Sequence, residues 1–507
     1  MNNLSLFKDK RVLVAMSLSL LALAEILDTT IVNVALKDIM GSISANRSEG
    51  SWIITSYITA AAIGMPLAGI VSRKFGRKKI ILISTVLFAA SSVMCGFSSS
   101  ITEIVIFRII QGCGGAFIPT LCQAYIVDTF TEEERPRVMF YYISAIILGP
   151  ILGPIIGGSI VEHMSWPWIF YINVPICAFS FTLLLPLMPE TKKINIKIDY
   201  ISFLFLVIGI GGIEYFLNQG DMSGWFNSSI MILSLTAGLL FTVFFIWRGL
   251  LGKSVLNFNI FKYRNFVLGC ITMFSFTAVI YLVMSYFPLM LENLYNYPSE
   301  TTGFLTSPRG IAAIACTPLI LYLSRKIDAR FIIMFGLLVF AFASYLLSGF
   351  SPYQGMGHVI IPVILQGIGI SSVYSVLILL AYYNFPHHLS DSAGGMYSFS
   401  RMLGGSVGAA VGAAFLSRFS QVNWNDMIHS VNEYNNNLTI FFNSLSVHLS
   451  KEQTLAVIAK KIYFNSTFIS YTNLYLTASG ILLILLVLPF IFKKMNKNDI
   501  KSFPDSL

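Results

Sequence analysis

Two acidic side chains lie in an apolar stretch near the N-terminus, where an ionisable group can do proton chemistry. Glu25 and Asp28 are three positions apart in LVAMSLSLLALAEILDTTIVNVAL (residues 13–36), so an α-helix places them on one face. A carboxylate inside such a helix is costly unless it is protonated or paired. A carboxyl group that alternates between a desolvated site and one beside an arginine can load and release a proton. We therefore predict that Asp28 carries protons and that Glu25 assists it.

A second polar set interrupts another apolar segment. In FRIIQGCGGAF (residues 107–117) four residues follow one helix face at i, i+3, i+4 and i+7: Arg108, Gln111, Gly112 and Gly115. An arginine in hydrocarbon costs about 2.5–3.5 kcal/mol on insertion scales, so Arg108 should face the bundle interior or a wet cavity. We predict that Arg108 tunes the proton affinity of Asp28. The alternatives are a packing arginine bonded to backbone carbonyls, or a structural bond from Asp28 to Arg108 or to Asn33.

Two further arginines lie inside apolar segments of the C-terminal part. Arg401 heads SRMLGGSVGAAVGAAF (residues 400–415), in which Gly404 or Gly405, Gly408 and Gly412 continue its face as a close-packing seam. This pattern fits a packing seam alone or a contact with substrate. Arg309 follows Pro308, and a second cation in the cavity would suit anionic substrates. The candidates for the substrate cavity are Asn33, Gln111, Arg309 and Arg401.

The composition requires a membrane around these residues. Hydrophobic residues make up 55% of the 507-residue chain and charged residues 11%, whereas a soluble chain carries about 25% charged residues. Apolar windows of about 19 residues predict an all-α polytopic membrane protein with fourteen transmembrane helices. Their expected limits are 12–36, 51–72, 80–98, 101–126, 139–161, 169–189, 199–217, 228–248, 266–291, 302–323, 331–350, 357–383, 392–416 and 469–492. Glu214, near the outer end of the seventh span, is expected at the membrane interface.

Charge orients the spans. Most of the 33 lysine and arginine residues fall in segments on the N-terminal side of the membrane: residues 8–11, 73–79, 135–137, 192–197, 248–264, 325–330 and 493–501. The positive-inside rule therefore places both termini in the cytoplasm, in a multi-pass protein of the cytoplasmic (inner) membrane. The net charge of +9 is an orientation signal and needs no nucleic-acid partner. The one long loop, residues 417–468, is then outside; it is either a solvated cap between two helices or a docking surface for a partner protein.

Two short patterns recur in the second half of the chain. PLAGIVSRK (residues 66–74) returns as PLILYLSRK (318–326), and QGCG (111–114) returns as QGIG (366–369). Both copies fall on the second and fourth span of their half, which predicts two six-helix bundles related as parallel repeats. The spans at 199–217 and 228–248 are then an insertion. The expected domains are residues 1–189, the inserted pair in 190–250, and residues 251–507 with the outer loop 417–468.

Two glycine-containing segments are candidates for gating and packing. LGPILGPIIGGSI (residues 148–160) cannot favour an ordinary straight helix, because proline removes a backbone hydrogen bond and kinks the chain. Its candidate residues are Gly149, Pro150, Gly153, Pro154, Gly157 and Gly158; the alternative is a merely flexible helix. In GIVSRKFGRKK (69–79), Gly76 allows a tight turn, and basic residues including Arg73 and Arg77 would anchor at anionic lipid headgroups. A plain positive-inside loop is the alternative there.

These patterns together resemble the major facilitator superfamily and, within it, the fourteen-span drug:proton antiporters of the EmrB/QacA type. The resemblance runs from LDTTIVNVAL (residues 27–36) through WPWIFYINVPI (166–176) to the last span. It implies a major facilitator fold arranged as 6+2+6 helices, with the first helix lining the central cavity. Asp28 matches the Asp of the family motif LDxTIVNVA, and Arg108 takes the position assigned to proton transfer. The segment at 148–160 resembles the antiporter motif, which is associated with exporters.

The resemblance also has implications for gating and partners. The superfamily normally has an Asp where Arg73 stands, so the usual carboxylate-to-helix latch of the inner gate is in doubt in this chain. EmrB-like pumps of double-membrane bacteria work with a periplasmic adaptor (EmrA-like) and an outer-membrane channel. The segment at 417–468 would be the exposed surface for that adaptor.

No nucleotide-binding, nucleophile-elbow, HExxH or dinucleotide motif occurs in a plausible context, and the six cysteines lack metal-ligand spacing. We therefore expect no enzyme activity, no cofactor and no metal, and transport driven by an ion gradient. The predicted function is proton-driven efflux of amphiphilic drugs or toxic small molecules, with antibiotic resistance as its consequence. The alternatives are export of a specific endogenous metabolite or a siderophore-like anion, and proton-coupled uptake, which the segment at 148–160 disfavours.

Overall fold

The structure of the 507-residue chain is a computed structural model. It describes residues 10–45, 47–131, 134–191, 193, 199–252, 254, 258–351, 355, 357–386, 389–429, 431 and 451–494. Within these residues all regular elements are helices, in agreement with the predicted all-α class.

The helices follow the chain in three groups. The first half contains α1 (Lys10–Ser42), α2 (Arg47–Phe75), α3 (Arg77–Phe97), α4 (Ile101–Gly115), α5 (Phe117–Thr129), α6 (Arg135–His163), α7 (Trp168–Tyr171) and α8 (Asn173–Leu187). Between the halves lie α9 (Tyr200–Ser223), η2 (Trp225–Asn227), α10 (Ser229–Leu250) and η3 (Phe258–Lys262). The second half contains α11 (Arg264–Met284), α12 (Tyr286–Tyr295), α13 (Ser299–Thr306), α14 (Pro308–Lys326), α15 (Ala329–Ser348), α16 (Gly357–Ala381), α17 (Ser390–Ile428), α19 (Lys451–Leu485) and α20 (Leu488–Ile491).

The helices are long and apolar enough to cross a membrane repeatedly. The described residues contain 13 candidate spans, or 14 when the two parts of α6 count as one. Those parts, Arg137–Pro150 and Leu152–His163, meet at 44°. The bend falls within the predicted glycine-proline segment, where Pro150 and Pro154 each remove a backbone hydrogen bond. The protein is therefore a multi-pass membrane protein.

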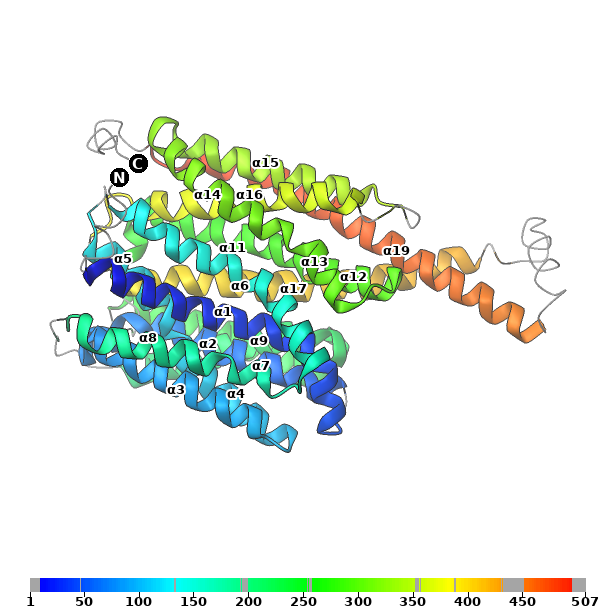
Figure 1. The fold of residues 1–507 in the computed structure, drawn as a ribbon, viewed down its shortest axis with the longest axis horizontal. Coiled ribbons are helices and arrows are strands. Elements are labelled where there is room, and N and C mark those ends of the chain that lie inside the picture. The colour runs from blue at the N-terminus through cyan, green and yellow to red at the C-terminus, as the bar shows by residue number, and fades with distance from the viewer. Residues whose placement is uncertain are drawn as a thin grey trace.

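The two halves lie side by side, with α3, α4 and α8 far from α15 and α16 (Figure 1). We call the end of the bundle at which α1 begins the terminus end; α19 runs toward the same end (Figure 1). We call the opposite end, where α17 finishes at Ile428 and α19 starts at Lys451, the hairpin end. Helices of one half touch the other half mainly through α17 against α2 and α5, and through α6 against α13, α14 and α16.

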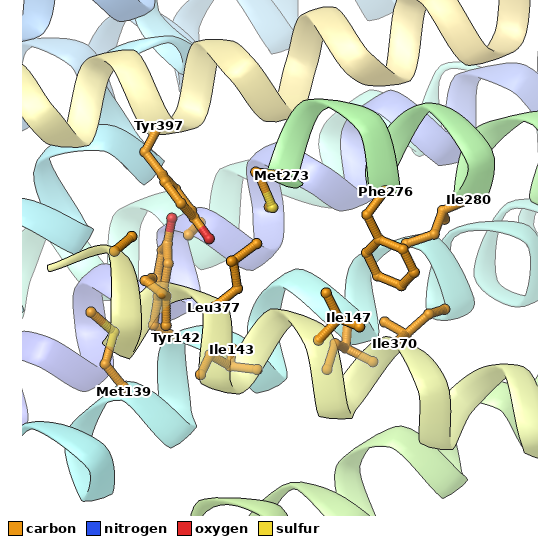
Figure 2. Packing of buried hydrophobic residues seen from close by; sticks show 14 of the residues in the cluster. Met139, Tyr142, Ile143, Ile147, Met273, Phe276, Ile280, Ile370, Leu377 and Tyr397 are labelled. Carbon is orange, nitrogen blue, oxygen red and sulfur yellow. The ribbon is translucent and has the colours of Figure 1, made fainter. Parts of the chain in front are cut away.

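Apolar side chains fill the junction of the halves. Figure 2 shows this part of the core, where α6 of the first half meets α11, α16 and α17 of the second. Its labelled members are Met139, Tyr142, Ile143, Ile147, Met273, Phe276, Ile280, Ile370, Leu377 and Tyr397. Toward the terminus end, glycines bring the backbones together: a Cβ on Gly395 of α17 would lie 2.5 Å from the Met65 carbonyl oxygen of α2. Close backbone approach of this kind is how helices gain contact inside a membrane.

The segment at 417–468 differs from the polar loop that the sequence predicts. Residues 417–428 continue α17, and residues 451–468 belong to α19, so both helices project beyond the bundle as a hairpin (Figure 1). Asn423 Nδ2 donates to Ser470 Oγ at 2.9 Å, and the rings of Trp424 and Tyr463 are 6.4 Å apart. The hydropathy window detects where apolar residues stop, whereas a helix continues as long as its backbone hydrogen bonds do. Residues 432–450 lie outside the described part.

Candidate functional site

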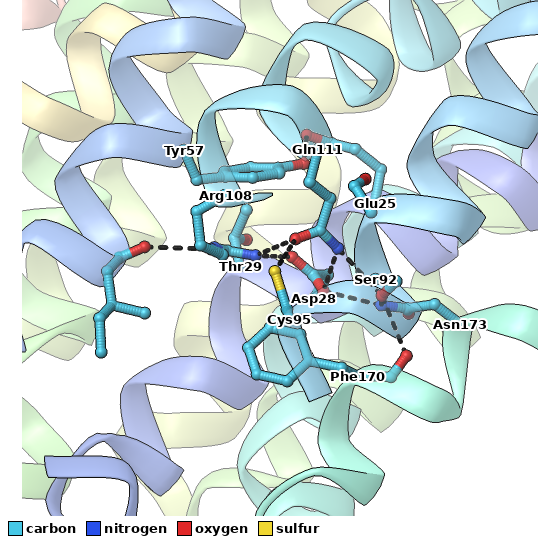
Figure 3. Close-up of polar contacts among 12 residues, drawn as sticks. Glu25, Asp28, Thr29, Tyr57, Ser92, Cys95, Arg108, Gln111, Phe170 and Asn173 are labelled. Carbon is cyan, nitrogen blue, oxygen red and sulfur yellow. Dashed lines mark hydrogen bonds and ion pairs between the residues drawn. The ribbon is translucent and has the colours of Figure 1, made fainter. Parts of the chain in front are cut away.

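Asp28 is the centre of a buried polar cluster in the first half (Figure 3). Its side chain is fully buried. Arg108 Nη1 of α4 donates to Asp28 Oδ2 at 2.5 Å, Gln111 Nε2 donates to Oδ1 at 2.9 Å, and Asn173 Nδ2 donates to Oδ1 at 2.7 Å. Three donors from α4 and α8 thus converge on one carboxylate of α1. A charged carboxylate accepts all three bonds, whereas a protonated one loses part of its acceptor capacity.

Arg108 has three interactions in addition to its pairing with Asp28. Its guanidinium lies over the Tyr57 ring at 4.2 Å, Nε donates to the carbonyl oxygen of Ile53 at 3.0 Å, and Nη1 also donates to Gln111 Oε1 at 2.7 Å. The side chain is 1% exposed. The bond to a backbone carbonyl and the pairing with Asp28 therefore exist together, although the sequence analysis treated them as alternatives. Asn33 is exposed, and its amide donates to the carbonyl oxygen of Thr29 at 3.1 Å instead of Asp28.

Local sequence explains how α4 presents its polar face. Ser100 caps the helix, because its hydroxyl accepts a bond from the backbone N–H of Glu103 at 3.4 Å. Gly112 faces α2, where a Cβ would lie 2.5 Å from the Tyr57 carbonyl oxygen, and Gly115 faces the Tyr57 hydroxyl. These glycines let α4 approach α2 closely enough for Arg108 to reach both Ile53 and Asp28.

Several residues that position the cluster were not predicted from the sequence. Ser92 Oγ of α3 accepts from Gln111 Nε2 at 3.1 Å and from Asn173 Nδ2 at 2.9 Å, and donates to the carbonyl oxygen of Phe170 at 3.0 Å. Asn173 follows the break between α7 and α8. Its position inside WPWIFYINVPI was a signal, since a buried amide in an apolar span needs partners. Ser92 gave no comparable signal, because serine is common at many packing positions in membrane helices.

Glu25 lies next to the cluster and faces the second half. Tyr57 donates its hydroxyl to Glu25 Oε1 at 3.1 Å, while Oε2 has no hydrogen-bond partner among the described residues. Arg401 of α17 lies within electrostatic range of Glu25. Glu25 therefore lies between the Asp28 cluster and Arg401.

Arg401 lines a small cavity between the halves. The cavity measures about 10 Å³, roughly the size that holds one water molecule. Its walls combine Arg401 with tyrosines, apolar side chains and polar groups from both halves: Gln123, Tyr142, Ile143, Ile146, Met273, Tyr374, Ile378, Tyr397 and Ser398. The glycines that follow Arg401 face α11 and α12, with Gly404 against Phe274, Gly408 against Ala278 and Gly412 against Tyr286. The seam and the cavity arginine thus occur on the same helix.

Gln111 and Arg309, which were also predicted to line the substrate cavity, lie elsewhere in the structure. Gln111 is fully buried in the Asp28 cluster. Arg309 is buried within the second half, where its Nε donates to Gln366 Oε1 at 3.0 Å and its guanidinium lies 6.0 Å from the Phe287 ring. Among the described residues Arg309 Nη2 and Gln366 Nε2 have no partner. Neither residue lines the cavity around Arg401.

The glycines of the bent helix α6 face α1. Gly149 packs against Ile26 and Gly153 against Thr30, and the Thr30 hydroxyl also donates to the Gly149 carbonyl oxygen at 3.2 Å. A Cβ on Gly157 would lie 3.2 Å from Ile31, and Gly158 is buried. The glycine-proline segment thus packs against the turns of α1 that carry Asp28.

At the terminus end, the loop between α2 and α3 is tied to its neighbours. Gly76 adopts φ 97°, in the left-handed region that favours glycine, and a Cβ there would strike Glu190. Arg77 forms an ion pair with Asp128 at the end of α5, and its backbone N–H donates to Thr191 Oγ1 at 3.0 Å. Arg73 donates to the carbonyl oxygen of Gly69 in its own helix at 3.1 Å. Gly69 in turn packs against Ser392 at the start of α17.

Glu214, which the sequence predicts at the membrane interface, is packed among helices. The side chain is fully buried in the middle of contacts among α9, α2 and α17, and Asn218 Nδ2 donates to its Oε2 at 3.0 Å. Hydropathy alone places a residue along a span, but the face that it occupies depends on which helices pack there.

Comparison with known proteins establishes the family. The sequence matches the Major Facilitator Superfamily over residues 18–409. This chain belongs to that superfamily. The transporter is 32% identical to the multidrug export protein EmrB of Haemophilus influenzae over 94% of this chain and 95% of that protein. It is 30% identical to the fatty acid resistance protein FarB of Neisseria gonorrhoeae, covering 95% and 96% of the two chains.

The fold of the transporter is also found among solved structures. The proton:xylose symporter XylE superposes with a TM-score of 0.60 at 15% identity and covers 99% of both chains. The predicted resemblance to EmrB-type exporters and the predicted major facilitator fold are confirmed.

Proposed function

We propose that this protein is a proton-driven exporter of amphiphilic drugs or other toxic small molecules, and that it confers antibiotic resistance. The observation that carries the proposal is the buried Asp28–Arg108 pair with its three donors, in a member of a transporter superfamily. A charged pair inside a membrane helix bundle is expensive, so its presence there points to a role in ion movement. The multidrug export protein EmrB among the relatives supports drugs as the substrate class.

The cluster suggests how a proton drives the conformational change. When a proton binds Asp28, the carboxyl group becomes neutral and its bond to Arg108 weakens, while Arg108 keeps its bonds to Ile53 and Gln111. The α1 segment that carries Asp28 packs on the bent part of α6, and α6 contacts α13, α14 and α16 of the other half. A shift of α1 can therefore reach the junction of the halves. Each proton that crosses 100 mV supplies about 2.3 kcal/mol.

The cavity around Arg401 is the proposed start of the substrate site. Its tyrosines, isoleucines and Met273 suit a flat apolar body, and the single guanidinium suits an acceptor or anionic group. Glu25 would connect this site to Asp28, because it interacts with Arg401 on one side and with Tyr57 on the other. Arg309 and Asn33 stay candidates for a wider cavity in another conformation.

The proposal is tested in proteoliposomes with the Asp28→Asn variant. We expect this variant to insert and to bind substrate, but to lose substrate-induced proton release and to confer no resistance on cells. The control is Asp38→Asn, which changes an exposed carboxyl of the same helix. Full proton-coupled efflux by Asp28→Asn would refute the role of Asp28.

The alternative, export of one endogenous metabolite or a siderophore-like anion, is not favoured by the relatives, which include the multidrug export protein EmrB. Accumulation of a fluorescent amphiphilic drug in whole cells separates the possibilities. Multidrug export lowers the accumulation, whereas a dedicated metabolite exporter leaves it unchanged and an uptake symporter raises it.

We also propose the 6+2+6 arrangement, with α9 and α10 as the insertion, both termini in the cytoplasm, and a location in the cytoplasmic membrane. The concentration of lysine and arginine near the terminus end supports this orientation. A membrane-impermeant thiol reagent should label Asn425→Cys in intact cells and should not label Lys494→Cys. The reverse pattern would invert the topology.

The helical hairpin of α17 and α19 is the proposed docking surface for a periplasmic adaptor (EmrA-like) that leads to an outer-membrane channel. The hairpin projects beyond the bundle, and its arms are joined by Asn423–Ser470 and by the Trp424–Tyr463 contact (Figure 1). Deletion of residues 425–460 leaves Trp424 and Tyr463 to close a shorter hairpin. This deletion should preserve membrane insertion and abolish co-purification with the adaptor; unchanged co-purification would place the docking site elsewhere.

A further inference from the structure

Helix α9 contacts both halves of the transporter. On the first half, the Tyr215 ring stacks on Trp52 of α2 at 5.3 Å, and Gln219 Nε2 donates to Ser51 Oγ at 2.8 Å. On the second half, α9 packs along α17, where Ser406 lies beside the carboxyl group of Glu214. Any movement of the halves relative to each other must therefore change the contacts on at least one face of α9.

Glu214 is the buried acid on this helix. It lies six residues before the end of the candidate span Tyr200–Gly220, about 9 Å along the helix axis. Its side chain is 0% exposed. Asn218 Nδ2 donates to Oε2 at 3.0 Å and also to the backbone carbonyl oxygen of Glu214 at 2.9 Å. Among the described residues, Oε1 has no hydrogen-bond partner.

The charged groups on the packed helices are not close to this carboxyl. In α2, Glu49 is exposed at the hairpin end, while Arg73 and Lys74 lie at the terminus end. In α10, Arg248 lies at the terminus end and pairs with Asp199 at 2.6 Å. The short helix η2 contains no acidic or basic residue.

On α17, Arg401 faces the cavity and lies five residues before Ser406, which turns the two side chains about 140° apart. Arg418 and Asp426 are exposed further toward the hairpin end. No charged side chain in the described part of these helices therefore neutralises Glu214.

A carboxylate in this environment is desolvated and unpaired, so the neutral carboxylic acid is the stable form. The hydrogen bonding agrees with that form. Asn218 Nδ2 donates to Oε2, which leaves Oε1 available to carry the proton, while Ser406 lies beside the carboxyl group. Separation of α17 from α9 would expose the same group to water, where the carboxylate is stable.

We propose that Glu214 is a second proton-binding site, which keeps its proton while α9 packs against α17 and releases it to water when the two helices separate. This inference rests on the proposed proton-driven transport. In the step, the O–H bond at Oε1 breaks, the proton passes to water, and Glu214 remains as a carboxylate that accepts bonds from Asn218 and water. A proton from water on the other side of the membrane rebinds before α9 packs against α17 again, because the packed site excludes water.

The test counts protons in proteoliposomes that contain the purified full-length protein. A pH-sensitive dye reports protons released per molecule of a fluorescent amphiphilic anion that is bound, for the wild type, Glu214→Gln and the control Glu162→Gln. Glu162 is an exposed carboxyl of α6. We expect Glu214→Gln to release about half as many protons as the wild type, and Glu162→Gln to match the wild type. Equal proton release by Glu214→Gln and the wild type would overturn the inference.

A second measurement covers the case in which Glu214→Gln folds but does not transport. Infrared difference spectra of the wild type should contain carbonyl bands of protonated carboxylic acids that are lost when substrate binds, and Glu214→Gln should lack one component of them while the component from Asp28 remains. Identical bands in the wild type and Glu214→Gln would also refute the inference. Failure of the proposed function gives a different result. In that case the wild type itself releases no proton when substrate binds, whatever the variants do.

Discussion

The repeated glutamine-glycine motif has different surroundings in the two halves of the transporter. In the first half, Gly112 of α4 lies against α2, next to the Tyr57 carbonyl oxygen, while Gln111 bonds to Asp28 of α1 and to Ser92 of α3. In the second half, Gln366 and Gly367 of α16 lie against α14, with Gly367 next to the Arg309 carbonyl oxygen. The repeat offset of PLAGIVSRK and PLILYLSRK places Arg309 at the position of Tyr57. The contact of the motif's glycine with a backbone carbonyl of the neighbouring helix is therefore present twice.

The charges around this shared contact are not repeated. Arg108 has the carboxylate of Asp28 at 2.5 Å, whereas Arg309 has the neutral amide of Gln366 and the aromatic ring of Phe287. Among the described residues, no acidic side chain exerts an electrostatic influence on Arg309. Packing and proton chemistry are therefore separable. The glycine contact between helices recurs in both halves, whereas the pair of a carboxylate with an arginine is confined to the first.

The largest effect is expected from removal of Arg108. Arg108→Leu leaves Asp28 as a buried charge with only amide partners, which should lower the free energy of unfolding by about 3–5 kcal/mol. Thermal unfolding in detergent measures the stability, and resistance of cells measures the loss of efflux. A variant as stable as the wild type would show that Asp28 gains nothing from its arginine.

The double variant Asp28→Asn with Arg108→Leu separates the loss of the ion pair from the loss of each side chain. Both charges are gone, so the stability should recover relative to Arg108→Leu, with a coupling energy of about 0.5–3 kcal/mol in a double-mutant cycle. Proton-coupled efflux should stay absent, because no titratable group remains at the centre of the cluster. Additive losses in the cycle would contradict direct coupling of the two residues.

The matching change in the second half should have a smaller effect. Arg309→Met removes an unpaired buried charge but leaves Gln366 Oε1 without its donor, and the two effects oppose each other. We expect the free energy of unfolding to stay within about 1.5 kcal/mol of the wild type. A loss as large as that of Arg108→Leu would break the comparison between the halves and reveal a counter-ion for Arg309.

The repeated glycines should respond alike, since their contacts are alike. Gly112→Ala and Gly367→Ala each place a methyl group against a backbone carbonyl, of Tyr57 and Arg309 respectively. Overpacking of this kind costs about 1–3 kcal/mol. Denaturation of the two variants side by side provides the check; a loss in one half only would mean that the helix contact is not equivalent.

The smallest effect is expected from an ion pair at the rim. The hydrogen bond from Arg248 lowers the pKa of Asp199, so the pair stabilises the fold above the ordinary carboxyl pKa and loses this contribution as the pH falls through the lowered value. Both side chains reach solvent, which limits the contribution to below about 1 kcal/mol. Asp199→Asn should therefore flatten the acid limb of the stability curve only slightly, as measured by unfolding midpoints from neutral to acidic pH.

Part of the site was predictable because hydrocarbon penalises charge. Asp28 and Arg108 are each costly in an apolar segment, so each had to find a partner, and the pairing of the two followed. The bend of α6 was predictable from Pro150 and Pro154 for a local reason, the loss of backbone hydrogen bonds. Asn173 and Ser92 were not found, because uncharged polar residues are tolerated at many positions and their role depends on helices distant in sequence.

The positions of the apolar spans, and the charged groups in them that needed partners, were evident from the sequence, since the bilayer acts on each segment separately. The packing of the helices set which faces meet. It placed Arg309 inside the second half and buried Glu214 where α9 packs against α17. The reason is physical: hydropathy is a property of one helix, whereas the burial and partners of a side chain are set by several helices packing together.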